Sequence, residues 1–224
     1  MAGPASVSTL LLRNVPLFSQ LPETQLALLS RVVGRKTFPR STTVISAGDV
    51  TDTLYIVLSG RLKVLMSDDE GREVILAILG QGEFFGEMGL IDDAPRSATV
   101  IAIEACELLS VSKADFKKCL AENFDIALGV MRGLVKRLRD ADRKIGSLAL
   151  MDVYGRVARL LLEMAEDIDG QKVVTKKLPK QDIAKMIGAS REMVSRVMKD
   201  LQMGGYIEVK PGAIILRDNI LMAH

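Results

Sequence analysis

The sequence predicts an α+β protein with a β-rich first part, one long helix and a helical, basic last part. Short β-branched or alternating runs between residues 43 and 111 are separated by turn residues at roughly 8–12-residue spacing, which is typical of an antiparallel sandwich or roll. An apolar repeat with a period of about 3.5 residues then fills 124–148, as in a helix that packs on a second helix. We expect three parts, 1–122, 123–150 and 151–224.

Composition places the chain among globular proteins. Its 224 residues are 48% hydrophobic and 26% charged, which suits one large domain or two small ones. No apolar run reaches the ~18 residues of a membrane span, and residues 1–18 lack the pattern of a signal peptide. We therefore expect a cytoplasmic protein with no membrane partner.

Residues for metal or covalent chemistry are scarce. His224 is the only histidine, and Cys106 and Cys119 lie far apart in different expected elements. These numbers argue against a zinc site, histidine-ligated haem, an iron–sulfur cluster and a Ser-His-Asp triad, and they make free thiols the expected state. We expect a protein that is not an enzyme.

The β-rich part should begin with short helices over residues 7–35, where Pro22-Glu23 suits a helix start. Ser112, with Asp115 three residues on, has the spacing of a helix cap and predicts a short helix that leads into the long one. The strands expected between them are 43–45, 53–58, 61–66, 74–78, 98–102 and 108–111.

The apolar repeat predicts a helix that pairs with a second copy of itself. Its members recur at steps of three and four, while charged residues fill the flanks. They are Phe124, Ala127, Met131, Leu134, Leu138, Ala141, Ile145 and Leu148. A surface helix that packs on its own domain has nearly the same period and is the alternative. The place of the repeat between two unlike parts favours a homodimer.

One loop of the β-rich part, residues 84–100, has the composition of a phosphate site. Gly86 lets backbone approach a ligand, residues 87–91 can form one helical turn with free N–H groups, and Arg96 supplies a fork for phosphate oxygens. Buried together, Glu87 and Arg96 would also satisfy each other. A turn with a surface ion pair is the alternative interpretation.

The last part contains a helix, a tight turn and a second helix over residues 179–199. Ala184 is small where the helices cross, Gly188 can take the positive φ of the turn, and Ser190 can cap the second helix. An ordinary helical hairpin is the alternative, but its exposed side would not need two arginines and a glutamate. Residues 206–216 then predict a β-hairpin, the wing.

This segment is strongly basic. Between Lys172 and Lys199 eight basic residues, among them Lys176 and Lys177, stand against two acidic ones, which indicates a polyanionic partner. The candidate DNA-contacting residues are Lys180, Ser190, Arg191, Glu192, Ser195, Arg196 and Lys199.

The loop and the helix-turn-helix together resemble the cyclic AMP receptor / FNR family of bacterial transcription regulators. The resemblance covers residues 14–218 and includes the segments 55–60 and 150–158. It implies a β-roll sensor, a dimerisation helix and a winged helix-turn-helix. It also implies that Glu87 binds a ribose 2′-hydroxyl, that Arg96 binds the cyclic phosphate, and that Gly86 and Ser97 add phosphate contacts. The candidate ligand residues are Gly86, Glu87, Met88, Arg96, Ser97, Ala141 and Asp142.

The chain departs from the family where the base is read. The cyclic AMP receptor places Thr-Ser against adenine, and Ala141-Asp142 stands here instead. Asp142 offers only acceptors, which suits the N1–H and N2–H₂ donors of guanine, but it can equally pair with a partner-chain arginine such as Arg139 or Arg143. Cyclic AMP is the first expectation, followed by cyclic di-GMP or cyclic GMP, and then by a regulator without ligand.

For DNA the resemblance implies a TGTGA-like half-site in an inverted repeat. Arg191 and Arg196 would contact guanines, Glu192 would accept from a cytosine amino group, and RNA polymerase would be the protein partner. A cyclic-nucleotide-binding module acting on a kinase or channel subunit is the alternative, against which the basic helix-turn-helix argues. An enzyme acting on a cyclic nucleotide would lack a placed nucleophile.

Overall fold

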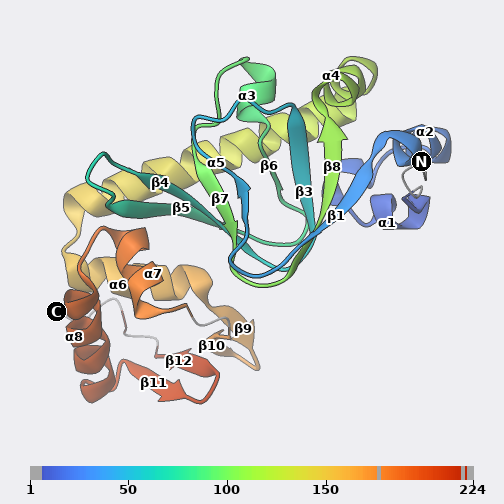
Figure 1. Ribbon diagram of the computed structural model, residues 1–224. Helices are drawn as coiled ribbons and strands as arrows, with labels where there is room; N and C mark the ends of the chain where they lie inside the picture. Colours follow the sequence, from blue (N-terminus) through green and yellow to red (C-terminus); the bar gives the residue numbers. More distant parts are fainter. Residues whose placement is uncertain (1–6, 176–177, 218–219, 221–224) are drawn as a thin grey trace. The chain divides into compact units, whose positions relative to one another are not determined.

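In the computed structural model the chain divides into two compact units, Met1–Arg137 and Leu138–His224 (Figure 1). The structure describes residues 7–175, 178–217 and 220, so that Lys176, Lys177 and His224 lie outside the described residues. Within them the fold is α+β, as the sequence predicts.

The first unit combines helices with eight described strands. Helix α1 (Thr9–Arg13), the 3-10 turn η1 (Pro16–Phe18) and helix α2 (Glu23–Val32) come first, and Pro22 precedes α2 as expected. The strands are β1 (Gly34–Phe38), β2 (Thr43–Ile45), β3 (Thr53–Ser59), β4 (Leu62–Ser67), β5 (Glu73–Leu79), β6 (Phe84–Phe85), β7 (Thr99–Ala102) and β8 (Cys106–Ser112). Helices α3 (Met88–Ile91), α4 (Lys113–Glu122) and α5 (Phe124–Leu150) complete the elements that begin in this unit.

The strands form two antiparallel sheets, ordered β1-β8-β3-β6 and β2-β7-β4-β5 (Figure 1). Strand β3 is buried on both faces because successive side chains point to opposite sides of a sheet. Leu54 and Ile56 pack with the helices, whereas Tyr55 and Val57 pack with residues of the other sheet. The loop of residues 84–100 leaves the first sheet at β6 and enters the second at β7.

The six strands expected from the sequence are confirmed to within two residues at each end. The sequence pattern missed β1 and β6. The middle of β1 is polar and exposed, and β6 has only two residues, so neither carries an alternation long enough to detect. The Ser112 cap is confirmed, since its side chain accepts from the backbone N–H of Asp115 at 3.2 Å.

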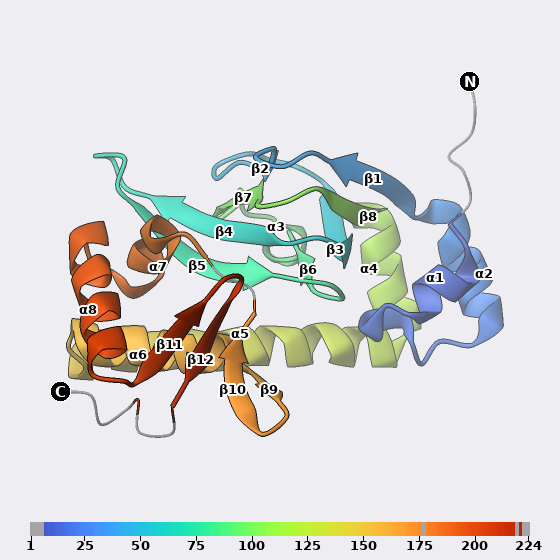
Figure 2. The ribbon, with the colours of Figure 1, turned by 90° about the horizontal axis from the view of Figure 1, so that it is seen from below.

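Helix α5 is one continuous helix of 27 residues (Figure 2). Ile126 and Val130 are buried in the core between the helices and the first sheet of the first unit, called the sensor core below. Leu134 packs against the same core. Leu134, which the sequence pattern assigns to the seam, is half-buried against this core, and its place in the seam stays a prediction. Leu134 follows Ile126 and Val130 at the same spacing of four residues, so it lies on the helix face that this core covers.

The outward face of α5 is nevertheless apolar. Its exposed apolar residues are Phe124, Met131, Val135, Leu138, Ile145, Leu148 and Leu150. Steps of four and three join Met131, Val135 and Leu138, and the same steps continue through Asp142 to Ile145. Ala141 and Asp142 are both exposed, and steps of three and four from Leu138 to Ile145 pass through either residue.

The second unit is a small α+β fold. It contains α6 (Val153–Met164), β9 (Glu166–Ile168), β10 (Gln171–Val174), α7 (Lys180–Ile187), α8 (Arg191–Met203), β11 (Ile207–Lys210) and β12 (Ala213–Leu216). The strands pair in the order β11-β12-β10-β9, and Figure 2 shows both hairpins of this sheet. The expected wing is confirmed as β11–β12, while β9–β10 was not predicted. Val157, Leu161, Val194 and Leu201 lie in the core that joins its helices.

Candidate functional site

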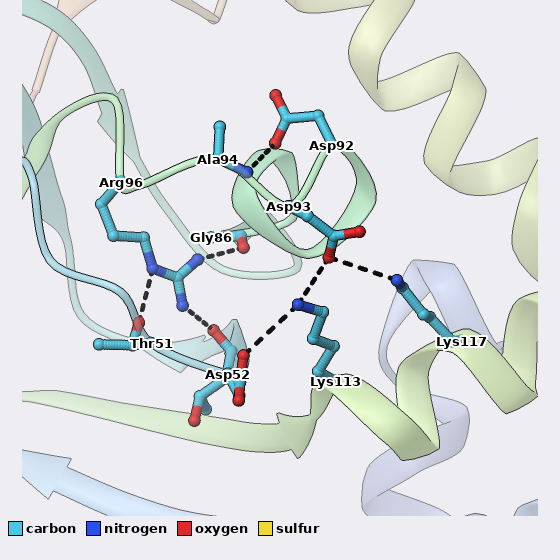
Figure 3. Close-up of polar contacts among 10 residues, drawn as sticks. Thr51, Asp52, Gly86, Asp92, Asp93, Ala94, Arg96, Lys113 and Lys117 are labelled. Atoms are coloured by element: carbon cyan, nitrogen blue, oxygen red, sulfur yellow. Dashed lines mark hydrogen bonds and ion pairs between the residues drawn. The ribbon is translucent and has the colours of Figure 1, made fainter.

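Arg96 is the centre of the candidate ligand site. It lies on the loop between α3 and β7, and only 5% of it is exposed. Its Nε donates to Thr51 Oγ1 at 2.6 Å, its Nη2 donates to the carbonyl oxygen of Thr53 at 2.6 Å, and its Nη1 donates to the carbonyl oxygen of Gly86 (Figure 3). Burial lowers the pKa of the Arg96 guanidinium, against the pull of nearby Tyr55 and Glu87.

Gly86 makes this arrangement possible. Its φ of +85° is a conformation that other residues rarely adopt, and a Cβ built on it would lie 2.7 Å from Arg96 Nη1 and 3.0 Å from the Thr53 carbonyl oxygen. The close backbone approach expected at Gly86 is therefore present, and in this structure it is made to the Arg96 guanidinium.

Glu87 is a buried residue of the same loop, but its partner is not Arg96. Its Oε1 lies 2.5 Å from Arg137 Nη1, and the residue is 1% exposed. The predicted mutual pairing of Glu87 and Arg96 is wrong: three donors of Arg96 go to hydroxyl and carbonyl oxygens, and Glu87 Oε1 accepts from Arg137 instead. The second oxygen, Glu87 Oε2, is buried and has no hydrogen-bond partner among the described residues.

Arg137 is the residue that the sequence pattern missed. It comes from α5, donates to the Phe84 carbonyl oxygen as well as to Glu87, and lies over the Phe84 ring at 5.0 Å from its centre. In the sequence Arg137 is one of many charged residues that flank the apolar repeat, so the pattern does not single it out. Its position four residues before Ala141 is the one available signal, since residues four apart share a helix face.

A set of ion pairs braces the loop from outside. Lys113 Nζ, at the start of α4, lies 2.7 Å from Asp93 Oδ1 and 3.6 Å from Asp52 Oδ1, and Lys117 Nζ lies 3.4 Å from Asp93 (Figure 3). Lys113 holds the pKa of Asp93 below its usual value, and Asp93 in turn raises the pKa of Lys113. The brace joins the segment that carries Arg96 to the segment that carries its acceptor Thr51.

The remaining candidate ligand residues are exposed. Ser97 Oγ donates to Met88 Sδ at 3.7 Å, and both residues are exposed. Ala141 and Asp142 are exposed on α5 in the second unit, and their part in base recognition stays a prediction.

The site fits a ligand that carries an anion and a hydroxyl close together. Three of the five N–H groups of Arg96 have acceptors among the described residues, which leaves two for anionic oxygens. Glu87 Oε2 lacks a donor, and a buried carboxylate oxygen without one is costly. A ribose cyclic phosphate would supply both groups.

The described part of the chain holds no cluster of three or more residues suited to a metal ion, and no described helix is long and apolar enough to span a membrane.

The candidate DNA site lies on α8. Gly188 has a φ of +65° at the turn, and Ser190 Oγ accepts from the backbone N–H of Met193 at 3.1 Å, so the predicted turn and cap are both confirmed. The inner face of α8 is buried and its outer face is polar. The inner residues are Val194, Val197, Met198 and Leu201, and the exposed candidates are Arg191, Glu192, Arg196 and Lys199. Ser195 is half-buried, and Lys180 is exposed at the start of α7.

Arg156 secures the turn before α8. Its Nη1 donates to the carbonyl oxygen of Ile187 at 2.7 Å, which satisfies one of the unpaired carbonyl groups at the end of α7. A Cβ on Gly188 would lie 3.4 Å from Leu148 Cδ2. The orientation of α8 therefore depends on packing from α6 and from the last turns of α5.

Comparison with protein families matches both units. Residues 35–123 match the cyclic nucleotide-binding domain, and residues 155–219 match the Crp-like helix-turn-helix domain. The first match includes the loop of Arg96 and Glu87, and the second includes α7, α8 and the wing. The chain therefore combines a cyclic nucleotide-binding domain with a DNA-binding domain.

Individual relatives agree with these matches. The cAMP-activated global transcriptional regulator Vfr of Pseudomonas aeruginosa is 36% identical over 192 residues, which is 81% of this chain and 88% of that protein. The regulator CRP of Pasteurella multocida, also named cAMP-activated, is 37% identical over 74% of this chain and 81% of its own. Among solved structures, the c-di-GMP responsive regulator CLP of Xanthomonas campestris is 32% identical with a TM-score of 0.69, covering 83% of this chain and 94% of its own. The sensor loop, the helix-turn-helix and these relatives together establish that the chain belongs to the cyclic AMP receptor / FNR family of transcription regulators.

Proposed function

We propose that this regulator is a homodimer whose affinity for DNA is set by a cyclic nucleotide, with cyclic AMP as the first candidate. The observation that carries the ligand proposal is the buried, unpartnered Glu87 Oε2 beside the Arg96 guanidinium. A ribose hydroxyl would donate to the first group, and the cyclic phosphate would take the remaining N–H groups of the second. The names of two relatives at 36% and 37% identity support cyclic AMP.

Cyclic di-GMP is the second candidate, and a specific residue favours it. Asp142 offers only acceptors, whereas an adenine edge needs both a donor and an acceptor for full recognition. The CLP protein, named c-di-GMP responsive, supports the same alternative at 32% identity. The argument against guanine recognition is that Asp142 lies among the exposed apolar residues of α5. It would then belong to the seam between two copies of this helix.

On the DNA side, Arg191 and Arg196 would read guanines and Glu192 a cytosine in each half of a TGTGA-like inverted repeat. Two copies of α8 are needed for two half-sites, which ties the DNA proposal to the homodimer. The apolar residues exposed along α5 support that dimer. RNA polymerase is the expected protein partner, and a DNA-bound regulator belongs in the cytoplasm.

One pair of titrations tests the proposal. Calorimetry of the full chain with cyclic AMP, cyclic GMP and cyclic di-GMP should give heat of binding for one nucleotide far above the others. Fluorescence anisotropy on a TGTGA inverted repeat and on a scrambled duplex, at one fixed salt concentration, should then show that this nucleotide changes specific binding. If none of the three nucleotides binds, the ligand proposal is wrong. If the two duplexes bind equally with and without nucleotide, the DNA proposal is wrong.

A further inference from the structure

Helix α5 carries two glycines in its sensor-facing part, although glycine is unfavourable inside a helix relative to alanine. Gly129, Gly133 and Arg137 follow one another at intervals of four and therefore share one helix face. This face meets the segment that carries Phe84 and Glu87. Gly133 and Arg137 thus stand where α5 contacts the ligand loop, residues 84–100, whereas Gly129 faces Leu17.

The approach at Gly133 leaves no room for a side chain. A Cβ built there would lie 2.7 Å from Phe84 Cζ and 2.9 Å from Phe84 Cε1. The Phe84 ring is 7% exposed and belongs to the sensor core, so it has little space into which to move. At Gly129 the obstacle is softer, because the atom at 2.9 Å is the terminal Cδ1 of Leu17.

One turn after Gly133, Arg137 makes the contacts that hold Glu87. It donates to Glu87 Oε1 at 2.5 Å and to the carbonyl oxygen of Phe84, the same residue whose ring lies under Gly133. Moving α5 outward by a few tenths of an ångström would lengthen both bonds. The buried Glu87 would then be held less firmly by its cation, while its other oxygen already lacks a donor.

We propose that Gly133 is the positioning residue of the nucleotide site: the absence of its side chain sets the distance between α5 and Phe84, and so places Arg137 on Glu87. The Gly133–Phe84 contact is then the point at which the ligand loop is joined to α5. Glu87 presents Oε2 to the ligand only while Oε1 is held by Arg137. This inference rests on the proposed function, because nucleotide affinity is its main readout.

The test compares three alanine variants of the full chain on the same helix. Gly133→Ala should weaken binding of the nucleotide that the wild-type chain binds, cyclic AMP or cyclic di-GMP, by at least about tenfold in calorimetry. Gly129→Ala should lower nucleotide affinity less than Gly133→Ala does, since the methyl group of Leu17 can move. Gly146→Ala is the matched control, because a Cβ there meets nothing within 4 Å, and its affinity should stay within about twofold of wild type.

A second substitution separates positioning from a general loss of stability. Phe84→Leu removes the ring atoms that the new Cβ would meet. It should weaken binding in the wild-type background, because Arg137 loses its ring contact, but strengthen binding in the Gly133→Ala background. If Gly133→Ala does not fold, the double variant decides: recovery of folding and binding supports the inference, and failure of both overturns it.

Hydrogen exchange of the ligand-free protein provides a readout that does not need the nucleotide. Amides of 129–137 should lose protection in Gly133→Ala and keep it in Gly146→Ala. If the wild-type chain binds no cyclic nucleotide, the proposed function fails, and this exchange pattern alone then decides whether Gly133 positions α5. Wild-type affinity together with wild-type exchange in Gly133→Ala would overturn the inference.

Discussion

The candidate arginines of the two units differ in burial and in pairing. In the sensor, Arg96 is buried and donates to three protein oxygens, and Arg137 is bonded to a buried carboxylate. In the helix-turn-helix unit, Arg191 and Arg196 are exposed on the outer face of α8. Under the proposed function, the same side chain would serve two kinds of phosphate-bearing partner.

The difference follows from what each partner brings. A small ligand needs a site that is assembled beforehand, and Arg96, its proposed partner, is held in place by Thr51, Thr53 and Gly86. DNA presents long edges and a charged backbone, and exposed arginines have room to adapt to base positions along a groove. Substitutions in the sensor should therefore act through several contacts at once, and substitutions on α8 through one contact at a time.

The largest expected effect is at Arg96. Arg96→Ala should weaken cyclic nucleotide binding by ~3 kcal/mol or more, which is about a hundredfold or more in affinity. The reason is that an anionic phosphate would be buried without its cation. The Gly86 and Thr53 carbonyl oxygens would also lose their donor. Calorimetry measures the loss, and Arg96→Lys controls for charge, since lysine keeps the charge without the planar fork. Binding by Arg96→Ala within tenfold of wild type would contradict this role.

The next effect distinguishes DNA binding, which needs the proposed homodimer, from nucleotide binding, which needs one unit of one chain. Leu138→Asp should give monomers in light scattering, because it places two like charges on the two-fold seam, and it should reduce DNA binding more than nucleotide binding. Glu87, Arg96 and Arg137 all belong to one unit of one chain, which is why the ligand contacts should largely survive. Leu134→Asp is the matched comparison: Leu134 packs on the sensor core, so this change should lower the melting temperature instead. A dimeric Leu138→Asp protein would remove Leu138 from the seam.

A smaller effect sharpens the contrast on the DNA side. Arg191→Ala should cost ~1–3 kcal/mol on the specific duplex and relax the preference at one base pair, because a single exposed side chain is lost. Lys180→Ala should weaken specific and random duplexes alike and flatten the dependence on salt. Anisotropy on both duplexes at several salt concentrations distinguishes the two. Equal losses on both duplexes for Arg191→Ala would refute direct reading of a base.

The smallest effect concerns the brace outside the ligand loop. Lys113 lowers the pKa of Asp93, so this ion pair contributes while Asp93 is ionised and is lost as the pH falls through that lowered pKa. An NMR titration should place the pKa of Asp93 below the usual value of about 3.9 for this residue. In Lys113→Gln it should rise toward that value, and in Lys118→Gln, on the same helix, it should not change. An unshifted pKa of Asp93 in the wild-type protein would argue against the brace.

Local patterns predicted most elements of the fold. Alternating runs located six strands, Pro22 and Ser112 located two helix starts, and Gly188 with Ser190 located the turn before α8. These signals depend on neighbours close in sequence, through side-chain alternation, capping and backbone φ. They also brought together the residues of the ligand loop, because Gly86, Glu87 and Arg96 lie within one short segment.

Tertiary structure decided which of these groups meet. Glu87 bonds to Arg137, fifty residues away in the sequence, and not to nearby Arg96. Leu134 faces the core and Val135 faces outward, a choice set by how α5 packs rather than by its apolar repeat. Partner choice in a buried site depends on which donors are already taken and on how closely two elements approach. The sequence by itself determined most of the elements and the chemistry available. Only packing, through contacts as close as that of Gly133 with Phe84, determined which charges are paired.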